Sequence, residues 1–353
     1  MGEKRKIAVV LFNLGGPDGP DAVKPFLFNL FFDPYIIRQP APLRWLIAKI
    51  ISSRRTPVAQ EIYAQMGGKS PILEQTRKQA TALETAINKE ESAEYRVFIA
   101  MRYWHPLVEE TIAQIVDYGA DEILLLPLYP QFSTSTTESF FSVWEKAARD
   151  LDVPVKSVCC YPENDGFISA IAQKLKRTVA EHEDGNCRIL FSAHGLPKKF
   201  VEDGDPYQAQ VEQGVAAILD KAGLKSVDHV VCYQSRVGPV EWLKPYTDEE
   251  IERAGTDGRS VIVVPVAFVS EHSETLVELD IEYRELAASC GVPNYYRIET
   301  VQDDPIFING LVDIVTRTSA RKAVLAPDAE IPPCGGQWRS CPLKTGWNER
   351  ICR

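Results

Sequence analysis

The chain has 353 residues, of which 39 are Lys or Arg and 49 are Asp or Glu, so its formal net charge is −10 at pH 7. This acidic balance argues against a nucleic-acid-binding protein, because a negative surface repels phosphate backbones. Hydrophobic residues make up 45% and charged residues 25% of the chain, a globular composition that excludes disordered and fibrous classes and, at this length, predicts two domains.

The amino terminus shows no signal for export and no membrane anchor. The apolar stretch behind the first charged residues covers only residues 7–12, which is too short for a secretory signal. No run of about 18 apolar residues occurs elsewhere, so no membrane-spanning helix is predicted. We therefore expect a soluble, cytoplasmic protein.

Short apolar runs alternate with longer amphipathic segments along most of the chain. The runs are unbroken, as in strands buried on both faces of a parallel sheet, and they predict strands over residues 7–12, 95–101, 122–127, 153–159, 188–192, 229–232, 260–266 and 294–298. The amphipathic segments predict helices over residues 107–118, 137–150, 166–182, 207–222 and 274–289. This alternation predicts an α/β fold with doubly wound parallel sheets.

Eight strands are more than one five-stranded sheet holds comfortably, which favours two doubly wound domains. We expect the seam between them near residues 162–165. The predicted bounds are residues 1–163 for the first domain, 164–325 for the second, and 326–353 for a cysteine-containing C-terminal extension.

Polar loops follow four of the predicted strands. They cover residues 13–17, 128–136, 193–197 and 267–272, and they are rich in Gly, His and hydroxyl side chains. Functional residues of open α/β sheets lie beyond the carboxyl ends of the strands. We therefore expect these loops to converge on one site.

Two apolar, aromatic segments near the amino terminus have two interpretations. Residues 26–32 and 45–51 either pack inward or form an exposed apolar lip that faces a flat ligand or a membrane surface. Arg54 and Arg55 follow directly and suit contact with anionic lipid or with a ligand carboxylate.

The usual nucleotide-binding motifs are missing from the sequence. Residues 67–70 read Gly-Gly-Lys-Ser, like the end of a P-loop, but no predicted strand precedes them and the first glycine of that motif is absent. A helix start explains them better, with Ser70 as the cap and Pro71 at the first helical position.

A histidine and a row of acids stand out among the remaining polar residues. Glu274, Glu278 and Glu282 recur every four residues, so a helix would align three like charges along one face, where they either meet solvent or attract a divalent cation. His194 follows a predicted strand and precedes a glycine, which makes it a candidate acid or base.

Nine stretches of the chain, in order and with compatible spacing, resemble the ferrochelatase family. They are NLGGP (13–17), RRTP (54–57), GGKSPI (67–72), MRYWHP (101–106), PLYPQFSTSTT (127–137), FSAHGLP (191–197), GDPY (204–207), CYQSRVGPVEWLKP (232–245) and PVAFVSEHSETLVELDIEY (265–283). The resemblance extends from about residue 7 to about residue 319.

The resemblance implies an enzyme, a lyase-type metal chelatase, that inserts Fe²⁺ into protoporphyrin IX to give protohaem, the last step of haem biosynthesis. It also implies two flavodoxin-like domains with the porphyrin cleft between them. Ferrous iron and protoporphyrin IX would be the substrates. A chelatase for coproporphyrin and a non-catalytic tetrapyrrole carrier are the alternatives.

The resemblance also assigns roles to individual residues. His194 matches the metallation histidine and Glu274 the essential glutamate, and these two would contact the metal together with Glu278. Residues that match the porphyrin pocket, the propionate contacts and the cavity wall are Leu14, Arg55, Tyr63, Ser70, Arg102, Tyr103, Trp242, Phe268 and His272.

The cysteines near the carboxyl end suggest a shared metal centre that they would ligate together. Some ferrochelatases hold a [2Fe–2S] cluster with C-terminal cysteines, and Cys334, Cys341 and Cys352 resemble such a set. A fourth ligand would come from the body of the chain, with Cys160 or its neighbour Cys159 as the candidate. Structural zinc and ordinary thiols are the alternatives.

Location and assembly stay open at this point. The apolar lip predicts that a cytoplasmic protein also contacts the inner membrane peripherally. The sequence does not fix the oligomeric state, and a homodimer is one of the options.

Overall fold

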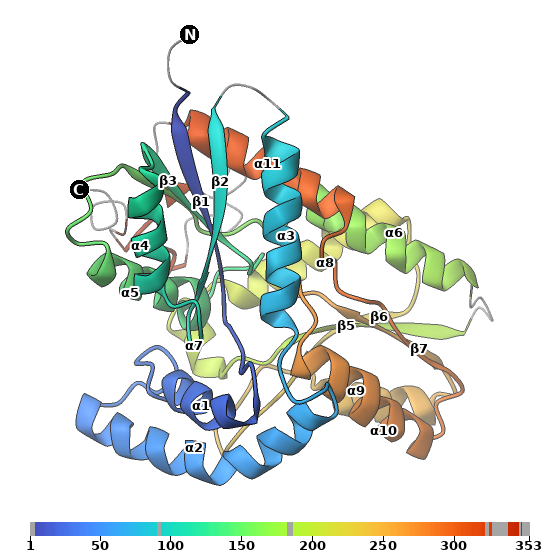
Figure 1. Cartoon of the computed structure of the whole chain (residues 1–353). Coiled ribbons are helices and arrows are strands. Elements are labelled where there is room, and N and C mark those ends of the chain that lie inside the picture. The colour runs from blue at the N-terminus through green and yellow to red at the C-terminus, as the bar shows by residue number, and fades with distance from the viewer. Residues whose placement is uncertain are drawn as a thin grey trace.

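The computed structural model of the chain describes residues 4–89, 93–181, 186–321, 325–326, 338–345 and 347, and it contains two parallel β-sheets (Figure 1). In the view of Figure 1, β1 and β2 of the first sheet run vertically, and β5, β6 and β7 of the second run across the picture. The predicted fold class, α/β with two doubly wound parallel sheets, is confirmed.

The first sheet has five strands in the order β2-β1-β3-β4-β9, and all of its pairs are parallel. Its strands are β1 (Lys6–Asn13), β2 (Glu94–Met101), β3 (Glu122–Pro127), β4 (Val155–Val158) and β9 (Leu325–Ala326).

The second sheet has four strands in the order β6-β5-β7-β8, again all parallel. Its strands are β5 (Cys187–His194), β6 (His229–Gln234), β7 (Ser260–Pro265) and β8 (Tyr295–Arg297). In chain order this is the same 2-1-3-4 arrangement as in the first sheet, so the two halves repeat one topology.

Helices connect the strands and cover the sheets. The α-helices are α1 (Val23–Phe31), α2 (Ala41–Ala64), α3 (Ile72–Ile87), α4 (Val108–Tyr118), α5 (Ser139–Ala147), α6 (Asp165–Glu181), α7 (Lys198–Glu202), α8 (Tyr207–Ala222), α9 (Thr247–Thr256), α10 (Tyr283–Ser289) and α11 (Pro305–Ala320). A 3₁₀-helix, η1 (Pro20–Ala22), and two π-helices, η2 (Thr134–Glu138) and η3 (Glu274–Glu282), complete the set.

All eight predicted strands are present, and the differences lie elsewhere. The strand β9 is not among the predicted strands; it pairs with β4 at the edge of the first sheet although it comes from the far end of the chain. The helix predicted over residues 274–289 consists of η3 followed by α10. The helix expected to start at Pro71 begins one residue later, and Ser70 Oγ accepts a hydrogen bond from Ile72 N at 3.4 Å.

The buried strands explain the long apolar runs of the sequence. Every residue of β3 and β7 is buried, because helices cover both faces of the central strands. Helices α1 and α2 are different: they pack against each other beyond the carboxyl end of β1, below the first sheet in Figure 1. The predicted domain bounds stay a prediction, although α11 contacts α3 of the first half as well as α6.

Buried polar side chains join the two halves. Gln131 Nε2 donates to Val266 O at 3.0 Å, and Gln79 Nε2 donates to Val269 O at 3.1 Å. The carboxylate of Asp205, which is fully buried, accepts from Thr134 N at 2.7 Å. Gln131, Val266 and Val269 directly follow β3 and β7, and Gln79 lies in α3, so these contacts hold the first half against the carboxyl end of the second sheet.

Candidate active site

Two histidines and a glutamate meet at the carboxyl end of the second sheet. His194 is the last residue of β5, and Glu274 is the first residue of η3, which follows β7. His194 Nε2 lies 3.5 Å from Glu274 Oε1, and His272 Nε2 lies 3.5 Å from Glu274 Oε2. One carboxylate therefore faces two imidazoles.

The two charged groups of this cluster, His194 and Glu274, each stabilise the ionised form of the other. Burial alone would lower the pKa of His194, but the carboxylate of Glu274 raises it to about 9. Burial alone would raise the pKa of Glu274, but His194 and His272 hold it well below its usual range. At neutral pH the first pair is therefore an imidazolium and a carboxylate. Side-chain exposures of 40% for His194 and 28% for Glu274 leave both accessible to a ligand.

Backbone contacts fix the orientation of His194. Its Nδ1 lies 2.5 Å from Gly195 O, and because a carbonyl oxygen can only accept, Nδ1 carries a proton and Nε2 is the atom that faces Glu274. Tyr207 OH donates to His194 O at 3.0 Å. A side chain at position 195 would place its Cβ 2.7 Å from Gln234 O, so the site needs glycine there.

Glu278 is surrounded by protein donors. Ser235 N donates to its Oε1 at 2.9 Å, and Tyr283 OH donates to the same oxygen at 3.1 Å. Gln234 Nε2 donates to Oε2 at 3.2 Å, and Ser235 Oγ donates to that oxygen as well. Burial and the charge of Glu274 raise the pKa of Glu278. Ser235 has a φ of 63°, a left-handed conformation that is uncommon for a residue other than glycine.

The row of three acids is not the continuous stripe that an α-helix would give. Glu274, Glu278 and Glu282 all lie in η3, a π-helix with hydrogen bonds from i to i+5. Glu274 and Glu278 are half-buried, whereas Glu282 is exposed. The row therefore divides into two acids at the site and one in solvent.

A second polar cluster, in the first half, is built around Asp33. Its buried carboxylate accepts from Arg102 Nη2 at 2.7 Å and from Tyr103 OH at 2.6 Å, and Ser139 Oγ donates to the same oxygen. Arg102 Nε donates to Ser139 Oγ at 2.7 Å. Sequence reasoning found Arg102 and Tyr103 but missed Asp33, and it also missed Gln234 and Ser235.

Most of the other expected pocket residues lie beside one of these two clusters. Phe268 and His272 have ring centroids 4.6 Å apart, and the Trp242 ring faces Gly195. Burial raises the pKa of Tyr63 to about 12, and the charge of Glu274 adds to the rise. Tyr63 and Tyr103 share an apolar cluster with Leu14 packed against it.

Arg55 and Ser70 are the exceptions among the expected residues. Arg55 is exposed on α2, with its guanidinium 6.0 Å from the Phe31 ring centroid. Ser70 is buried, and its backbone N donates to Pro17 O at 2.8 Å. Within the described ranges, neither side chain has a hydrogen bond or an ion pair to His194 or Glu274.

The two apolar segments near the amino terminus adopt different environments. In the first segment Phe26 and Leu27 are buried and the other apolar side chains are half-buried, so it packs mainly inward. In α2, four apolar side chains are 43–48% exposed: Leu43, Trp45, Leu46 and Ile50. Among the described helices, none combines the length and apolar character that a membrane span requires.

Only part of the expected cysteine set can be described. Cys160 and Cys341 are both buried, whereas Cys334 and Cys352 lie outside the described residues. Trp347 of the tail belongs to the same apolar cluster as Cys159 and Cys160. The described parts of the chain contain no group of three or more His, Cys, Asp or Glu side chains placed to hold a metal ion.

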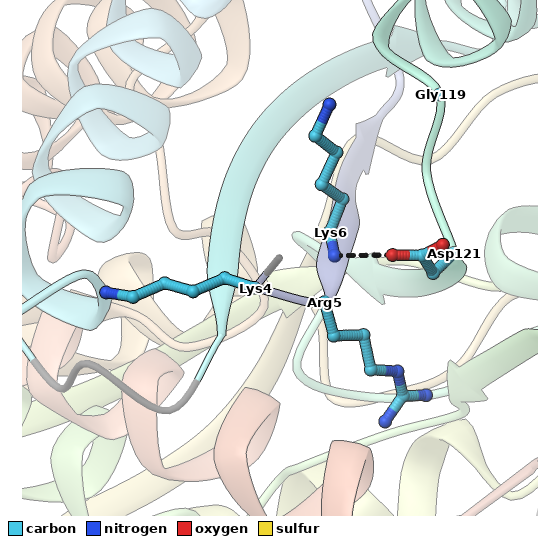
Figure 2. A pocket seen from close by; sticks show the side chains of 5 residues that line it. All are labelled: Lys4, Arg5, Lys6, Gly119 and Asp121. Carbon is cyan, nitrogen blue, oxygen red and sulfur yellow. Dashed lines mark hydrogen bonds between the residues drawn. The ribbon is translucent and has the colours of Figure 1, made fainter. Parts of the chain in front are cut away.

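A cavity of about 390 Å³ lies away from these residues, at the amino end of β1 (Figure 2). Lys4, Arg5 and Lys6 line it, but their side chains diverge in Figure 2. Arg5 pairs with Glu122 at 2.5 Å, and Lys6 Nζ lies 5.4 Å from the ring centroid of Tyr118. Two of these three cations are thus already engaged, and the cavity is not part of the candidate active site.

Known proteins resemble this chain over nearly its whole length. The ferrochelatase family profile matches residues 6–319. The ferrochelatase of Rickettsia bellii (strain OSU 85-389) is 49% identical over 345 residues, 97% of this chain and 94% of that protein. The ferrochelatase of Caulobacter vibrioides (strain NA1000 / CB15N) is 48% identical over 344 residues, 97% and 99% of the two chains. SirB from Bacillus subtilis with Fe³⁺ has the same fold, with a TM-score of 0.54 and 15% identity over 90% of this chain and 96% of that one.

Proposed function

The chain belongs to the ferrochelatase family of metal chelatases, and on that premise we propose that it inserts ferrous iron into protoporphyrin IX to form protohaem. The observation that carries the proposal is the accessible pair of His194 and Glu274, with 3.5 Å between the imidazole and the carboxylate. A protein that only carried a tetrapyrrole would not need a charged pair of this kind at its site.

Metal insertion requires a base beside the porphyrin ring. The ring nitrogens carry two protons that must leave as Fe²⁺ enters, and a positioned imidazole is suited to accept them. We assign this role to His194, because its Nδ1 is committed to Gly195 O and its Nε2 can accept a proton once the one that it holds toward Glu274 has left. Glu274 would receive or relay the proton, with Glu278 as the next acid along η3.

The ion pair of His194 and Glu274 would make the protonation state of His194 depend on whether a metal ion has arrived. His194 must lose its proton before it can accept another, and Glu274 stabilises that proton in the metal-free protein. A divalent cation that approaches Glu274 competes with the imidazolium for the same carboxylate and lowers the pKa of His194. In this proposal iron enters on the side of Glu274, its charge drives the imidazolium proton of the 40% exposed His194 side chain to solvent, and the neutral imidazole can then accept a ring proton.

The first half of the chain would hold the other side of the porphyrin. Leu14, Tyr63 and Tyr103 belong to or pack against one apolar cluster, which suits an apolar macrocycle. The charge of Arg102 is compensated by Asp33 at 2.7 Å, so it orients that cluster and adds no net positive charge. Arg54 and Arg55, exposed on α2, are cations available for propionates.

The number of carboxylates favours protoporphyrin IX over coproporphyrin. Protoporphyrin IX has two propionates, whereas coproporphyrin has four, and each needs a cation or solvent. With Arg102 neutralised by Asp33, the exposed pair Arg54 and Arg55 matches the smaller number. Coproporphyrin stays the second candidate substrate.

We include peripheral membrane contact in the proposal. Four apolar side chains of α2, Leu43, Trp45, Leu46 and Ile50, are exposed, and the same helix carries the exposed cations Lys49, Arg54 and Arg55. Apolar side chains flanked by cations are typical of helices that lie in the interface of an anionic bilayer. Such a contact would deliver an apolar porphyrin beside the site.

The cysteine set is a further part of the proposal. Cys160 and Cys341 are buried, as thiolate ligands of a [2Fe–2S] cluster usually are. The tail residue Trp347 packs into the apolar core that contains Cys160. Cys334 and Cys352 would complete the four ligands. A cluster of this kind would anchor the tail, while the proton chemistry stays with His194 and Glu274.

A comparison of two porphyrin substrates in separate assays tests the proposal. Purified protein is supplied with Zn²⁺ and either protoporphyrin IX or coproporphyrin III, and formation of the zinc porphyrin is followed by fluorescence. We expect a kcat/KM for protoporphyrin IX at least about tenfold higher, a difference of about 1.4 kcal/mol in transition-state binding. The opposite preference would reassign the substrate. Binding of both porphyrins without metal insertion would indicate a carrier.

A further inference from the structure

The π-helix that carries the site acids is unusually long. Most π-helices are single-turn insertions in α-helices, and they are frequent at functional sites. Here η3 spans nine residues, Glu274–Glu282, with Glu274 at its first position. A long stretch of this less favourable helix needs support from outside its own backbone.

Arg297, on β8, connects the segment before this helix with the last part of the helix. Its side chain is only 5% exposed, and its Nη1 donates to both oxygens of Glu271, at 3.0 and 3.1 Å. Its Nη2 donates to Asp280 Oδ2 at 2.5 Å. Glu271 precedes Glu274 by three residues and Asp280 follows it by six, so one guanidinium joins the segment before η3 to the last turns of η3.

Two further contacts hold the same segments. Tyr295, also on β8, donates from its OH to Leu279 O in η3 at 2.6 Å. Glu271 Oε1 accepts from Thr300 N at 2.8 Å and from Thr300 Oγ1 at 3.2 Å, and its side chain is 6% exposed. Two residues of β8, Tyr295 and Arg297, therefore bind two consecutive residues of η3, Leu279 and Asp280. Glu271 is held by both Arg297 and Thr300.

We propose that Arg297 is a positioning residue for metal insertion: by bridging Glu271 and Asp280 it keeps η3 in its π-helical form and so holds Glu274 between His194 and His272. Arg297 touches none of the groups that we assign to the reaction. The planar guanidinium can bind two carboxylates at once, whereas a lysine in its place could not reproduce the bridge. The inference rests on the proposed function, because it concerns the same site.

The second half contains a matched arrangement at its opposite end. Arg188 is 7% exposed and pairs with Asp228 at 2.9 Å and with Asp257 at 2.8 Å. It lies near the start of β5, whereas His194 is at the end of that strand. Loss of Asp257 therefore takes one of two carboxylates from a buried arginine, as loss of Asp280 does, but away from η3; Asp280 in addition lies 3.7 Å from Arg284.

The test compares Asp280→Ala with Asp257→Ala in the full-length protein. Both variants keep one carboxylate on the buried arginine, so neither leaves an uncompensated buried charge. Zinc insertion into protoporphyrin IX gives kcat and KM, and amide hydrogen exchange by mass spectrometry reports on residues 274–282. Thermal unfolding shows how much stability each variant loses.

We expect Asp280→Ala to lower kcat at least about tenfold at nearly unchanged porphyrin KM, because the reacting groups lose their alignment. Exchange in residues 274–282 should be faster in this variant than in Asp257→Ala, even where both lose similar thermal stability. Arg297→Lys should behave like Asp280→Ala.

Equal kcat and equal exchange in the two Asp variants would overturn the inference and leave Arg297 a structural residue only. The exchange measurement does not depend on activity. If the wild-type protein inserted no metal while exchange still separated the two variants, the proposed function would fail and the bridge would stand.

Discussion

His194 and Glu274 form an ion pair although 79 residues separate them in the chain: Nε2 of the histidine lies 3.5 Å from Oε1 of the glutamate. Each stands where a strand of the second sheet gives way to a loop or helix, at the end of β5 and after β7. These strands are neighbours in the sheet, and parallel pairing brings their carboxyl ends together. The site thus follows directly from the strand order.

Glu274 and Glu282 lie in one π-helix but in different surroundings, which makes them a matched pair for mutation. Glu274→Gln removes the carboxylate that pairs with both histidines, and we expect kcat for metal insertion to fall by two orders of magnitude or more, in the range of lost electrostatic catalytic groups. Glu282→Gln changes an exposed acid and should stay within about twofold of the wild type. A similar loss in both variants would show that the charge of the helix as a whole matters, rather than the position of Glu274.

The ionisation of His194 gives a prediction that needs no substrate. Burial lowers the pKa of His194 and Glu274 is the main group that raises it to about 9, so the pKa should fall well below 9 in the Glu274→Gln variant, where only Gly195 O and Glu278 still raise it. In the wild type the proton stabilises the fold below pH 6.5, and this contribution is lost as the pH rises through 9. Imidazole NMR titration measures the pKa in both proteins. An unchanged value in Glu274→Gln would contradict the assigned pairing.

Membrane contact should depend on the exposed apolar side chains of α2. Replacing Trp45 and Leu46 with Ser removes two large apolar side chains, which are 44% and 48% exposed, without disturbing the core. We expect flotation with anionic liposomes to drop severalfold for this variant at low salt. Val116, 57% exposed on α4, provides the control, because Val116→Ser should float like the wild type. Wild-type protein that stays wholly in the soluble fraction would exclude this contact.

The cysteine proposal can be tested by colour and metal content. Protein purified without oxygen should absorb in the visible range and contain about two sulfides per chain if the four cysteines hold a [2Fe–2S] cluster. Cys341→Ser should lose the absorption and unfold at a lower temperature, because a buried anchor of the tail is lost. Cys290→Ser, at a half-buried cysteine outside the proposed set, is the control. Colourless protein with about one zinc per chain would replace the cluster with a zinc site.

The strands could be predicted from sequence because their burial is nearly uniform. In β3 and β7 every side chain is buried, so each appears in the sequence as an unbroken apolar run. The strand β9 has only two residues and exists through its pairing with β4, which no local pattern reveals. The π-helix η3 was expected to be α-helical, since acids four residues apart fit an α-helical face and nothing local marks i to i+5 bonding.

The candidate site was predictable where a residue type is unusual for its position. His194 stands out because it ends an apolar strand, and the acids of η3 stand out by their spacing. Asp33 could not be found in this way, because its role arises from Arg102, Tyr103 and Ser139, which come from two other segments of the chain. Ser235 is similar: its importance comes from a left-handed backbone and from Glu278, which is 43 residues away.

The most direct test of the account is anaerobic insertion of Fe²⁺ into protoporphyrin IX by the wild type and by His194→Ala. Protohaem formation is followed by its absorption spectrum, and porphyrin binding is measured separately by fluorescence quenching. We expect protohaem from the wild type, and from His194→Ala a loss of at least about a hundredfold, the range of general base catalysis, with porphyrin binding within a few-fold of normal. Near-normal protohaem formation by His194→Ala would contradict the assignment of His194 as the base.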